Sequence, residues 1–397
     1  MTPAARVQSA IEIIDLVIVA ARDNGPPADK IIADWFRSRR FAGSSDRRAV
    51  RELAYGAIRK CGEIPQSGRA AMLTLANDDP SLGSLFDGSA HAPCRIAEGE
   101  RYARPGIAPA WLEKLLTGSE VSEAEAAALL GRAPLDIRVN SLKAERDGLE
   151  LPAQYEPTSA PHGLRLPFGT QVEQWPAYMA GLIEVQDTGS QLICEAVAAR
   201  PGETVIDLCA GAGGKTLALA AAMENRGTLL ACDTDRGRLS RLPQRAQRAG
   251  VTIIESLLLN PNCETEALSA WLDANGGKAD AVLVDAPCSG TGTWRRNPEG
   301  RWRLTPRELE KLGMLQSRLL DVASDLLRPG GRLIYAVCSI LDAEGPDQIA
   351  KFLSRHSQFR ASPVGLAAGS QRGSGIRLTP YHDGTDGFFV AQLLRIW

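Results

Sequence analysis

The sequence predicts an α/β protein: a Rossmann-like, largely parallel sheet preceded by an all-helical domain and a small α+β linker domain. With 397 residues the chain is too long for one ordinary hydrophobic core. Up to about residue 133 the apolar residues recur only at helical spacing. From residue 183 strand-like apolar runs alternate with helix-like stretches, the pattern of a doubly wound sheet. We therefore divide the chain into domains at 1–133, 134–182 and 183–397.

The individual elements follow from periodicity and from Pro and Gly breaks. The first predicted helix is marked by Val7, Ile11, Ile14 and Ile18. Short strands are expected at 136–139 and 163–166 in the linker. The sheet strands are expected at 204–208, 228–232, 252–258, 281–284 and 332–337, with helices at 216–223, 236–249, 263–274 and 305–327. In such sheets ligands bind beyond the carboxyl ends of the strands.

Composition excludes several classes of protein. The hydrophobic fraction of 44% and the charged fraction of 23% are typical of globular proteins, and no apolar run approaches the roughly 20 residues that cross a bilayer. We expect a cytoplasmic protein with no membrane partner. Eight cysteines without a C-x-x-C pair, and only four histidines, argue against a disulfide framework and against a metal site. A net charge of −2 restricts any nucleic-acid surface to a local patch.

Residues 207–216, DLCAGAGGKT, form a glycine-rich turn between a predicted strand and a predicted helix. A phosphate-binding loop would need glycine at Cys209, and a dinucleotide fingerprint would need its third glycine at Thr216. A third interpretation is a site for S-adenosylmethionine, with Asp207 near the ligand amine and Asp233, after the second strand, near the ribose. A tight turn without any ligand is the structural alternative.

Two cysteines follow two consecutive predicted strands, Cys288 in the sequence DAPCSGTG and Cys338 in YAVCSI. If these strands are neighbours, both thiols lie at the same edge of the sheet. Free cysteine is most often a small buried hydrophobe, and that interpretation suffices for Cys61, Cys94, Cys194, Cys232 and Cys263. Two Cys-Ser dipeptides at successive strand ends favour a functional role instead.

Cytosine chemistry explains why a thiol belongs there. Carbon 5 of cytosine is too weak a nucleophile to attack a sulfonium methyl group. Addition of a thiolate at carbon 6 makes carbon 5 nucleophilic, and the thiolate leaves again at the end. A carboxyl group at nitrogen 3, for which Asp285 is placed, would stabilise the adduct. This chemistry alone does not decide whether Cys288 or Cys338 is the nucleophile.

These motifs together resemble the Sun family of bacterial ribosomal RNA cytosine-5 methyltransferases, in its RsmB-like branch. The resemblance covers most of the C-terminal two-thirds of the chain. Besides the turn, Asp233 and the two cysteine motifs, it includes Arg138-Val-Asn140, Leu142-Lys143, Gln186-Asp187, Ser190-Gln191, Trp294-Arg-Arg-Asn-Pro298, Trp302-Arg303, Leu315-Gln316, Pro329-Gly-Gly331 and Asp386-Gly-Phe-Phe389.

The resemblance implies a class I (Rossmann-like) methyltransferase sheet and an RNA cytosine-5 methyltransferase that forms 5-methylcytosine. It makes Cys338 the nucleophile and Cys288 an aid to turnover, with Asp285 and Lys215 completing the catalytic group. The implied cofactor-binding residues are Cys209, Ala210, Gly211, Ala212, Gly213, Gly214, Lys215, Asp233, Asn260 and Asp285. Two positions depart from the family pattern: Val337 replaces the usual Thr, and Asn260 stands where an acidic residue is expected.

Two regions are expected to contact RNA. The helical domain resembles the NusB-like RNA-binding domain of the same branch, through residues 47–59; a solvated basic helix face is the alternative. After Cys288, arginines alternate with tryptophans, a combination that binds phosphates and stacks on unpaired bases. The predicted RNA-binding residues are Arg295, Arg296, Arg301 and Arg303.

We therefore expect a monomeric enzyme that acts on RNA, with ribosomal RNA as the expected substrate. Two other functions fit parts of the sequence. A DNA cytosine methyltransferase would use Cys288 as the nucleophile. A catalytically inactive RNA-binding or antitermination factor would keep the fold but not the chemistry, which the presence of Cys288, Cys338, Asp285 and Lys215 disfavours.

Overall fold

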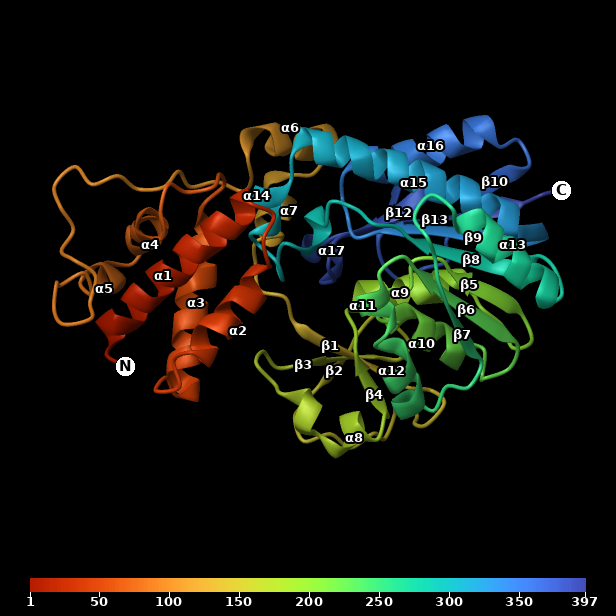
Figure 1. Ribbon diagram of the computed structural model, residues 1–397, viewed down its shortest axis with the longest axis horizontal. Helices are drawn as coiled ribbons and strands as arrows, with labels where there is room; N and C mark the ends of the chain where they lie inside the picture. Colours follow the sequence, from red (N-terminus) through yellow and green to blue (C-terminus); the bar gives the residue numbers. More distant parts are fainter. The chain divides into compact units, whose positions relative to one another are not determined.

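The computed structural model describes residues 1–397, which form two compact units (Figure 1). The first unit comprises Met1–Arg132 and Thr293–Pro306, and the second comprises Ala133–Gly292 and Arg307–Trp397. This arrangement differs from the predicted division in two respects. The segment Thr293–Pro306 belongs to the helical unit, and the expected linker domain belongs to the same compact unit as the large sheet.

The first unit is entirely helical, as predicted. Its helices are α1 (Pro3–Arg22), α2 (Ala28–Arg37), α3 (Ser44–Lys60), α4 (Gly68–Ala76), α5 (Pro80–Gly83), α6 (Ala110–Gly118), α7 (Glu123–Ala128) and α14 (Gly300–Arg303). The apolar stripe of α1 is buried in its core. Helix α4 approaches α1 so closely that a Cβ atom at Gly68 would overlap the Ile11 carbonyl oxygen. Trp302 of α14 lies in this same core.

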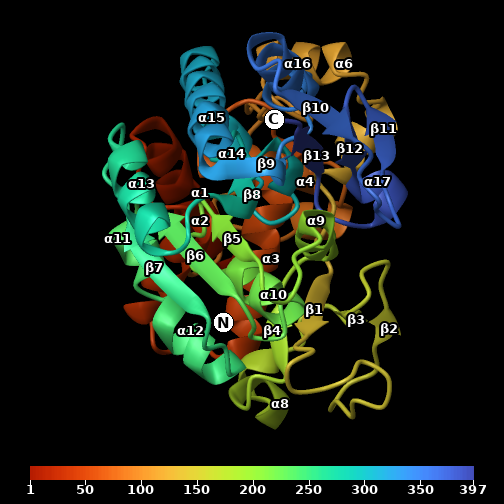
Figure 2. The same cartoon turned by 90° about the vertical axis from the view of Figure 1, so that its right-hand side faces the viewer.

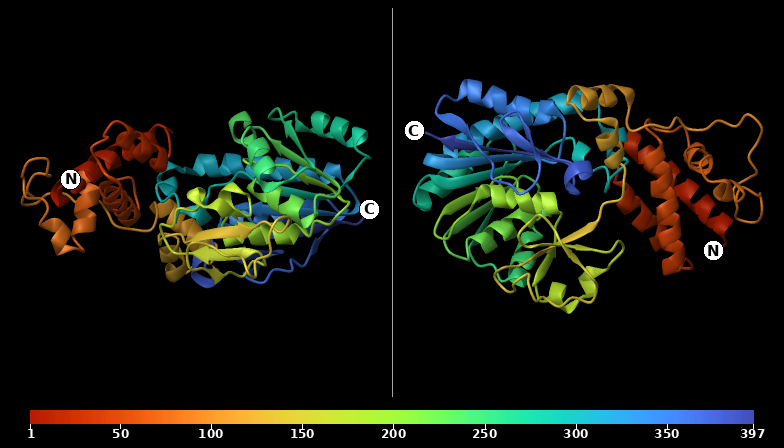
Figure 3. Two further views of the ribbon diagram at one scale, coloured as in Figure 1. Left: turned by 90° about the horizontal axis from the view of Figure 1, so that it is seen from below. Right: turned by 180° about the vertical axis from the view of Figure 1, so that it is seen from behind.

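A small antiparallel sheet opens the second unit (Figure 3, yellow). Its strands, in the order β2-β3-β1-β4, are β1 (Leu135–Val139), β2 (Glu156–Pro157), β3 (Gly163–Leu166) and β4 (Ile183–Val185). Buried bonds join it to the helices of the large sheet. Asp136 accepts hydrogen bonds from Thr188 N (3.2 Å) and Oγ1 (2.6 Å), and Glu184 forms ion pairs with Arg245 and Arg248. These bonds explain why it shares one unit with the large sheet.

The large sheet has nine strands and begins with the five that the sequence predicts. Strands β5 (Thr204–Asp207), β6 (Thr228–Asp233), β7 (Ile254–Leu258), β8 (Ala279–Asp285) and β9 (Leu327–Val337) are mutually parallel. Four antiparallel strands that were not predicted follow: β10 (Phe359–Ser362), β11 (Ser370–Arg372), β12 (Gly375–Leu378) and β13 (Phe388–Arg395). The order is β11-β12-β13-β9-β8-β5-β6-β7, with β10 beside β13. The predicted Rossmann-like class is confirmed.

Helices cover both faces of this sheet (Figure 2). Because strand side chains alternate between faces, Val205, Leu229 and Leu283 pack with the first group of helices, whereas Ile206, Leu230 and Val282 pack with the second. The first group is α9 (Thr188–Val197), α10 (Gly214–Ala222), α11 (Arg236–Leu239) and α12 (Leu242–Ala249). The second is α13 (Glu264–Ala274), α15 (Pro306–Leu326) and α16 (Pro346–Arg355).

The remaining short elements are α8 (Pro176–Met179), α17 (Pro380–Asp383) and the 3-10 turns η1 (Val172–Gln174), η2 (Thr291–Thr293) and η3 (Asp342–Glu344). The prediction of one helix over 236–249 was wrong, because the chain forms α11 and α12 with a break between them. Pro243 explains the break: it lacks a backbone N–H and fits only the first turn of a helix, where α12 places it. No helix in the chain has both the length and the apolar character needed to span a membrane.

Candidate active site

The two cysteines that end neighbouring strands lie together at the carboxyl edge of the large sheet. Strands β8 and β9 are paired in parallel, with Asp285 opposite Ala336. Cys288 follows β8, Cys338 follows β9, and their sulfur atoms are 3.3 Å apart. Both side chains are partly exposed. The geometry therefore offers a pair of thiols in contact with each other at the edge where such sheets bind ligands.

The surroundings of Cys288 change the acidity of its thiol. The hydrogen bond with Cys338 and the burial of the side chain raise the pKa of Cys288 well above its ordinary value. Burial disfavours a charged group, and the neighbouring thiol adds to that effect. The Cys288 thiol consequently resists losing its proton.

The glycine-rich turn between β5 and α10 is shaped by two positions with positive φ. Gly211 (φ 57°) donates its N–H to Asp233 Oδ2 at 2.7 Å, and a Cβ atom there would overlap the Arg238 guanidinium. Gly213 (φ 84°) caps α10, and a Cβ atom there would overlap Leu242. Only glycine satisfies both the conformation and the space. The turn thereby fixes Asp233, whose other oxygen accepts from Asp235 N at 2.7 Å.

Lys215 and Asp285 form a partly buried ion pair next to the thiols. Lys215 Nζ lies 2.6 Å from Asp285 Oδ2, and 5.9 Å from the centre of the Phe388 ring. Burial lowers the pKa of Lys215, but the charge of Asp285 outweighs burial, so that the net pKa is raised. Lys215 therefore stays protonated and supplies the positive charge that Asp285 needs in a partly dehydrated position.

Asp207 does not occupy the position that its predicted role requires. Its side chain is buried, accepts a hydrogen bond from Thr216 Oγ1 at 2.7 Å, and leaves its other oxygen without a partner. Burial raises the pKa of this carboxyl to about 7. Because Asp207 lies outside the lining of the cavity described next, it supports the turn rather than facing a ligand.

A cavity of about 430 Å³ extends along this edge of the sheet from Asp233 to the two cysteines. Of the ten predicted cofactor residues, three line it: Cys209, Asp233 and Asp285. The other seven do not: Ala210, Gly211, Ala212, Gly213, Gly214, Lys215 and Asn260. Pro261 and Asn262 line the cavity in place of Asn260. The rest of the lining was not predicted, because it comes from segments far apart in the chain: the loops after β5, β6, β7 and β8, and helices α11, α13 and α15. These additional lining residues are Leu208, Thr234, Asp235, Arg238, Leu259, Glu264, Ala286, Pro287, Leu315, Arg318 and Leu319.

The cavity lining suits S-adenosylmethionine. Asp233, at the end of β6, presents a carboxylate suited to ribose hydroxyls, and Leu259, Leu315 and Leu319 supply apolar walls suited to an adenine. The far end, at Asp285 and the thiols, is where a methyl group would meet its acceptor. No group of three or more His, Cys, Asp or Glu side chains in the chain is arranged to hold a metal ion.

The arginine-tryptophan segment after Cys288 is built into the helical unit. Arg301 has no exposed surface, and its Nη2 donates to the carbonyl oxygens of Ile58 (2.7 Å), Cys61 (2.8 Å) and Arg59 (3.2 Å). Trp302 Nε1 donates to the Cys61 carbonyl oxygen at 3.0 Å. A guanidinium without exposed surface cannot reach a phosphate, so the predicted RNA contact of Arg301 was wrong.

The other three predicted arginines differ in exposure. Arg303 donates to the carbonyl oxygens of Gly25 and Pro26, each at 2.7 Å, and Arg295 is 6% exposed. Arg296 is exposed. Of the four, Arg296 thus has the surface that an RNA phosphate contact needs.

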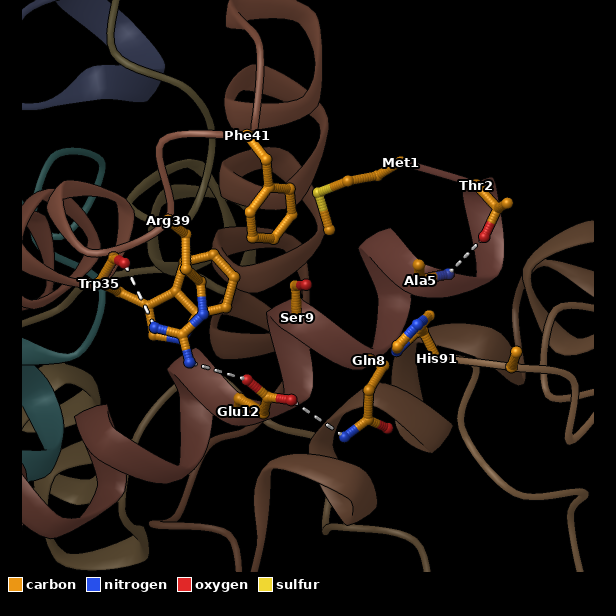
Figure 4. A pocket seen from close by; sticks show the side chains of 11 residues that line it. Met1, Thr2, Ala5, Gln8, Ser9, Glu12, Trp35, Arg39, Phe41 and His91 are labelled. Carbon is orange, nitrogen blue, oxygen red and sulfur yellow. Dashed lines mark hydrogen bonds and ion pairs between the residues drawn. The ribbon is translucent and has the colours of Figure 1, made fainter.

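The helical unit holds a second cavity of about 430 Å³ beside α1 (Figure 4). The Arg39 guanidinium lies 3.9 Å from the centre of the Trp35 ring and 3.6 Å from a Glu12 oxygen, and Phe41 is 74% exposed. No thiol lines this cavity. Cysteine chemistry therefore belongs to the cavity at the sheet edge.

A class I sheet with a nucleoside cavity that ends at two thiols defines an S-adenosylmethionine-dependent methyltransferase. The family model described as 16S rRNA methyltransferase RsmB/F matches residues 194–394. A probable ribosomal RNA small subunit methyltransferase B of Synechocystis sp. is 33% identical over 319 residues, which are 76% of this chain and 69% of that protein.

The ribosomal RNA small subunit methyltransferase B of Xanthomonas campestris pv. campestris is 34% identical over 329 residues, 78% of this chain and 72% of that protein. The crystal structure of PH0851 superposes with a TM-score of 0.76 at 25% identity and covers 99% of both chains. The chain belongs to the RsmB/F family of 16S rRNA methyltransferases.

Proposed function

We propose that this protein transfers a methyl group to carbon 5 of a cytosine in ribosomal RNA of the small subunit, through a covalent bond between Cys338 and the base. The observation that carries this proposal is the pair of thiols, 3.3 Å apart, at the end of the nucleoside cavity. The relatives are named as small-subunit ribosomal RNA methyltransferases, which makes that RNA the substrate to test first. An rRNA substrate also agrees with the cytoplasmic location and the monomeric state that we expect.

The residues divide the reaction among them. S-adenosylmethionine supplies the electrophilic methyl group. Cys338 Sγ forms a bond to carbon 6 of the base, and the electron pair of the double bond moves to carbon 5, which takes the methyl group. Asp285 engages nitrogen 3 as charge develops on the ring, and Lys215, 2.6 Å away, holds that carboxyl in place. Loss of the carbon 5 proton and cleavage of the carbon–sulfur bond restore the aromatic ring.

Cys288 assists the second half of this sequence. Its raised pKa keeps the thiol protonated while Cys338 attacks, and it lies in contact with the sulfur that must leave. A protonated thiol cannot take up the carbon 5 proton, so that proton leaves to solvent, and Cys288 donates its own proton to the Cys338 sulfur as the carbon–sulfur bond breaks. The target cytosine must leave its stack to reach the thiols, because a paired base cannot expose its carbon 6 face to them. We assign Arg296, which is exposed, to a phosphate contact of the RNA.

The test is methyl transfer from radiolabelled S-adenosylmethionine to small-subunit RNA purified from cells that lack this protein. The product is digested to nucleosides, and the label is expected in 5-methylcytidine. Duplex and single-stranded DNA of matched sequence run in parallel, since a DNA methyltransferase that uses Cys288 would label them. Absence of label in every substrate would instead indicate an inactive RNA-binding factor, and label in another nucleoside would overturn the assigned chemistry.

A further inference from the structure

Glu344 is a buried carboxylate that bonds to both cysteine-bearing loops. It lies in η3, six residues after Cys338, and is 1% exposed. It accepts hydrogen bonds from the backbone N–H of Ser289 (2.8 Å), from the Ser289 hydroxyl, from the Ser339 hydroxyl (2.6 Å) and from Gln316 Nε2 (3.0 Å). Ser289 and Ser339 are the residues directly after Cys288 and Cys338.

The surrounding bonds turn this contact into a rigid network. Gln316 of α15 also donates to the Pro287 carbonyl oxygen at 3.0 Å, immediately before Cys288. The hydroxyl groups of Thr291 and Ser339 are 2.9 Å apart, and Gly292 N donates to the Cys338 carbonyl oxygen at 3.0 Å. The two loops are thus bonded to each other and to α15 around a single carboxylate.

The backbone of Glu344 is itself held in place by β9 and β13. The Tyr335 hydroxyl, buried in β9, donates to the Glu344 carbonyl oxygen at 2.6 Å. A Cβ atom at the next residue, Gly345, would come within 2.8 Å of the Phe389 ring, so the chain passes there without room to shift. Glu344 therefore has little freedom to follow if the cysteine loops move.

A buried carboxylate is costly, and apolar packing could fill the same space at lower cost. Four donors to one side chain offset that cost only while both loops keep their places. A glutamine at this position would present an NH₂ group to some of these donors, and an NH₂ group accepts no hydrogen bond. The geometry of both loops therefore depends on the carboxylate, and that geometry keeps the two thiols at contact distance.

We propose that Glu344 is a positioning residue that sets the geometry of Cys338 relative to Cys288 and the nucleoside cavity. This inference rests on the proposed function of the thiols. Glu344 is not among the residues that line the cavity. Its effect therefore reaches the reaction through the two Cys-Ser dipeptides and through Gln316, which also bonds to Pro287.

The experiment compares Glu344→Gln with Glu203→Gln in the full-length protein. Glu203 is a matched control: its side chain is 14% exposed, it accepts from Arg332 (2.7 Å) and from Arg200 N (2.9 Å), and it lies at the opposite edge of the same sheet. The measurements are kcat, the KM for S-adenosylmethionine, and the melting temperature. A displacement on the order of 1 Å at a reacting group costs roughly 100-fold in rate. We expect that loss in kcat for Glu344→Gln, with unchanged KM, and no loss for Glu203→Gln.

Two further variants separate this inference from the proposed function. Ser339→Ala removes one donor and keeps the carboxylate, so it tests the network even if Glu344→Gln fails to fold; a smaller loss in kcat with unchanged KM is expected. A wild-type kcat in Glu344→Gln or in Ser339→Ala would overturn the positioning role of Glu344. A loss of kcat that only follows a lower melting temperature would overturn it as well. Neither result would change the role proposed for Cys338. If instead Cys338→Ala retains activity, the proposed function fails first.

Discussion

Replacing Arg301 with Lys tests whether the arginine-tryptophan segment is structural. The guanidinium of Arg301 serves the carbonyl oxygens of Ile58, Arg59 and Cys61, all from the end of α3, without any exposure to solvent. Lysine keeps the charge but not the planar fork that reaches several acceptors at once. The Cys61 carbonyl keeps the Trp302 Nε1 donor and the Ile58 carbonyl keeps the Cys61 N–H, so the loss falls mainly on the Arg59 carbonyl. A buried polar group left without a partner costs about 1–3 kcal/mol, and we expect the free energy of unfolding of the helical unit to fall by about that amount.

The assay is urea unfolding combined with hydrogen exchange, read in peptides from α1 to α4. Arg296→Ala is the control, since that side chain is exposed and belongs to the same segment. RNA affinity is measured over a range of salt concentrations, because a lost phosphate contact lowers the salt dependence by about one counterion. We expect Arg301→Lys to change stability alone and Arg296→Ala to change the salt dependence alone. Unchanged stability with a weaker salt dependence in Arg301→Lys would refute the structural assignment.

Three other predictions follow from the site. Between about pH 4 and 7 the folded state keeps a proton on Asp207 that the unfolded chain releases, so the free energy of unfolding falls as pH rises. Asp207→Asn should remove up to about 4 kcal/mol of this pH-dependent fall in the free energy of unfolding. An unchanged pH dependence in urea titrations of the variant would contradict this prediction. Peroxide should join Cys288 and Cys338 in a disulfide, because their sulfur atoms are in contact. Mass spectrometry should show the loss of two hydrogens, activity should be lost, and dithiothreitol should restore both. If both thiols persist after peroxide treatment, the result would argue against their contact. Asp233→Ala should weaken S-adenosylmethionine binding roughly 10- to 100-fold in calorimetry, whereas equal affinity would remove Asp233 from the site.

The sheet and the edge that carries the site could be predicted from sequence. Parallel strands that alternate with helices place their carboxyl ends together, so Cys288, Cys338 and Asp233 could be assigned to one edge without coordinates. The antiparallel strands β10, β11 and β12 were missed because each has only three or four residues, and β13, with eight, was missed because its sequence does not alternate between apolar and polar residues. Their pairing depends on partners far away in the chain, such as β9 with β13.

The packing of the arginine-tryptophan segment against the helical unit could not be predicted. Arg301 bonds to residues more than 200 positions earlier, and no local pattern distinguishes an arginine aimed at backbone carbonyl groups from one aimed at phosphates. Glu344 was missed for a related reason: the four groups that donate to its carboxylate belong to three residues in three separate segments. Asn260 shows that sequence does not predict which residue of a loop faces a ligand. The loop after β7 turns so that Pro261 and Asn262, rather than Asn260, line the cavity.

The central claim is that Cys338 forms the bond to the base and that Cys288 helps to break it. The direct measurement is the covalent protein-RNA adduct, detected with labelled small-subunit RNA on a denaturing gel for Cys288→Ala and Cys338→Ala. We predict that Cys288→Ala accumulates the adduct and that Cys338→Ala forms neither adduct nor methylated product. Adduct formation by Cys338→Ala, or methyl transfer at the wild-type rate, would contradict this account.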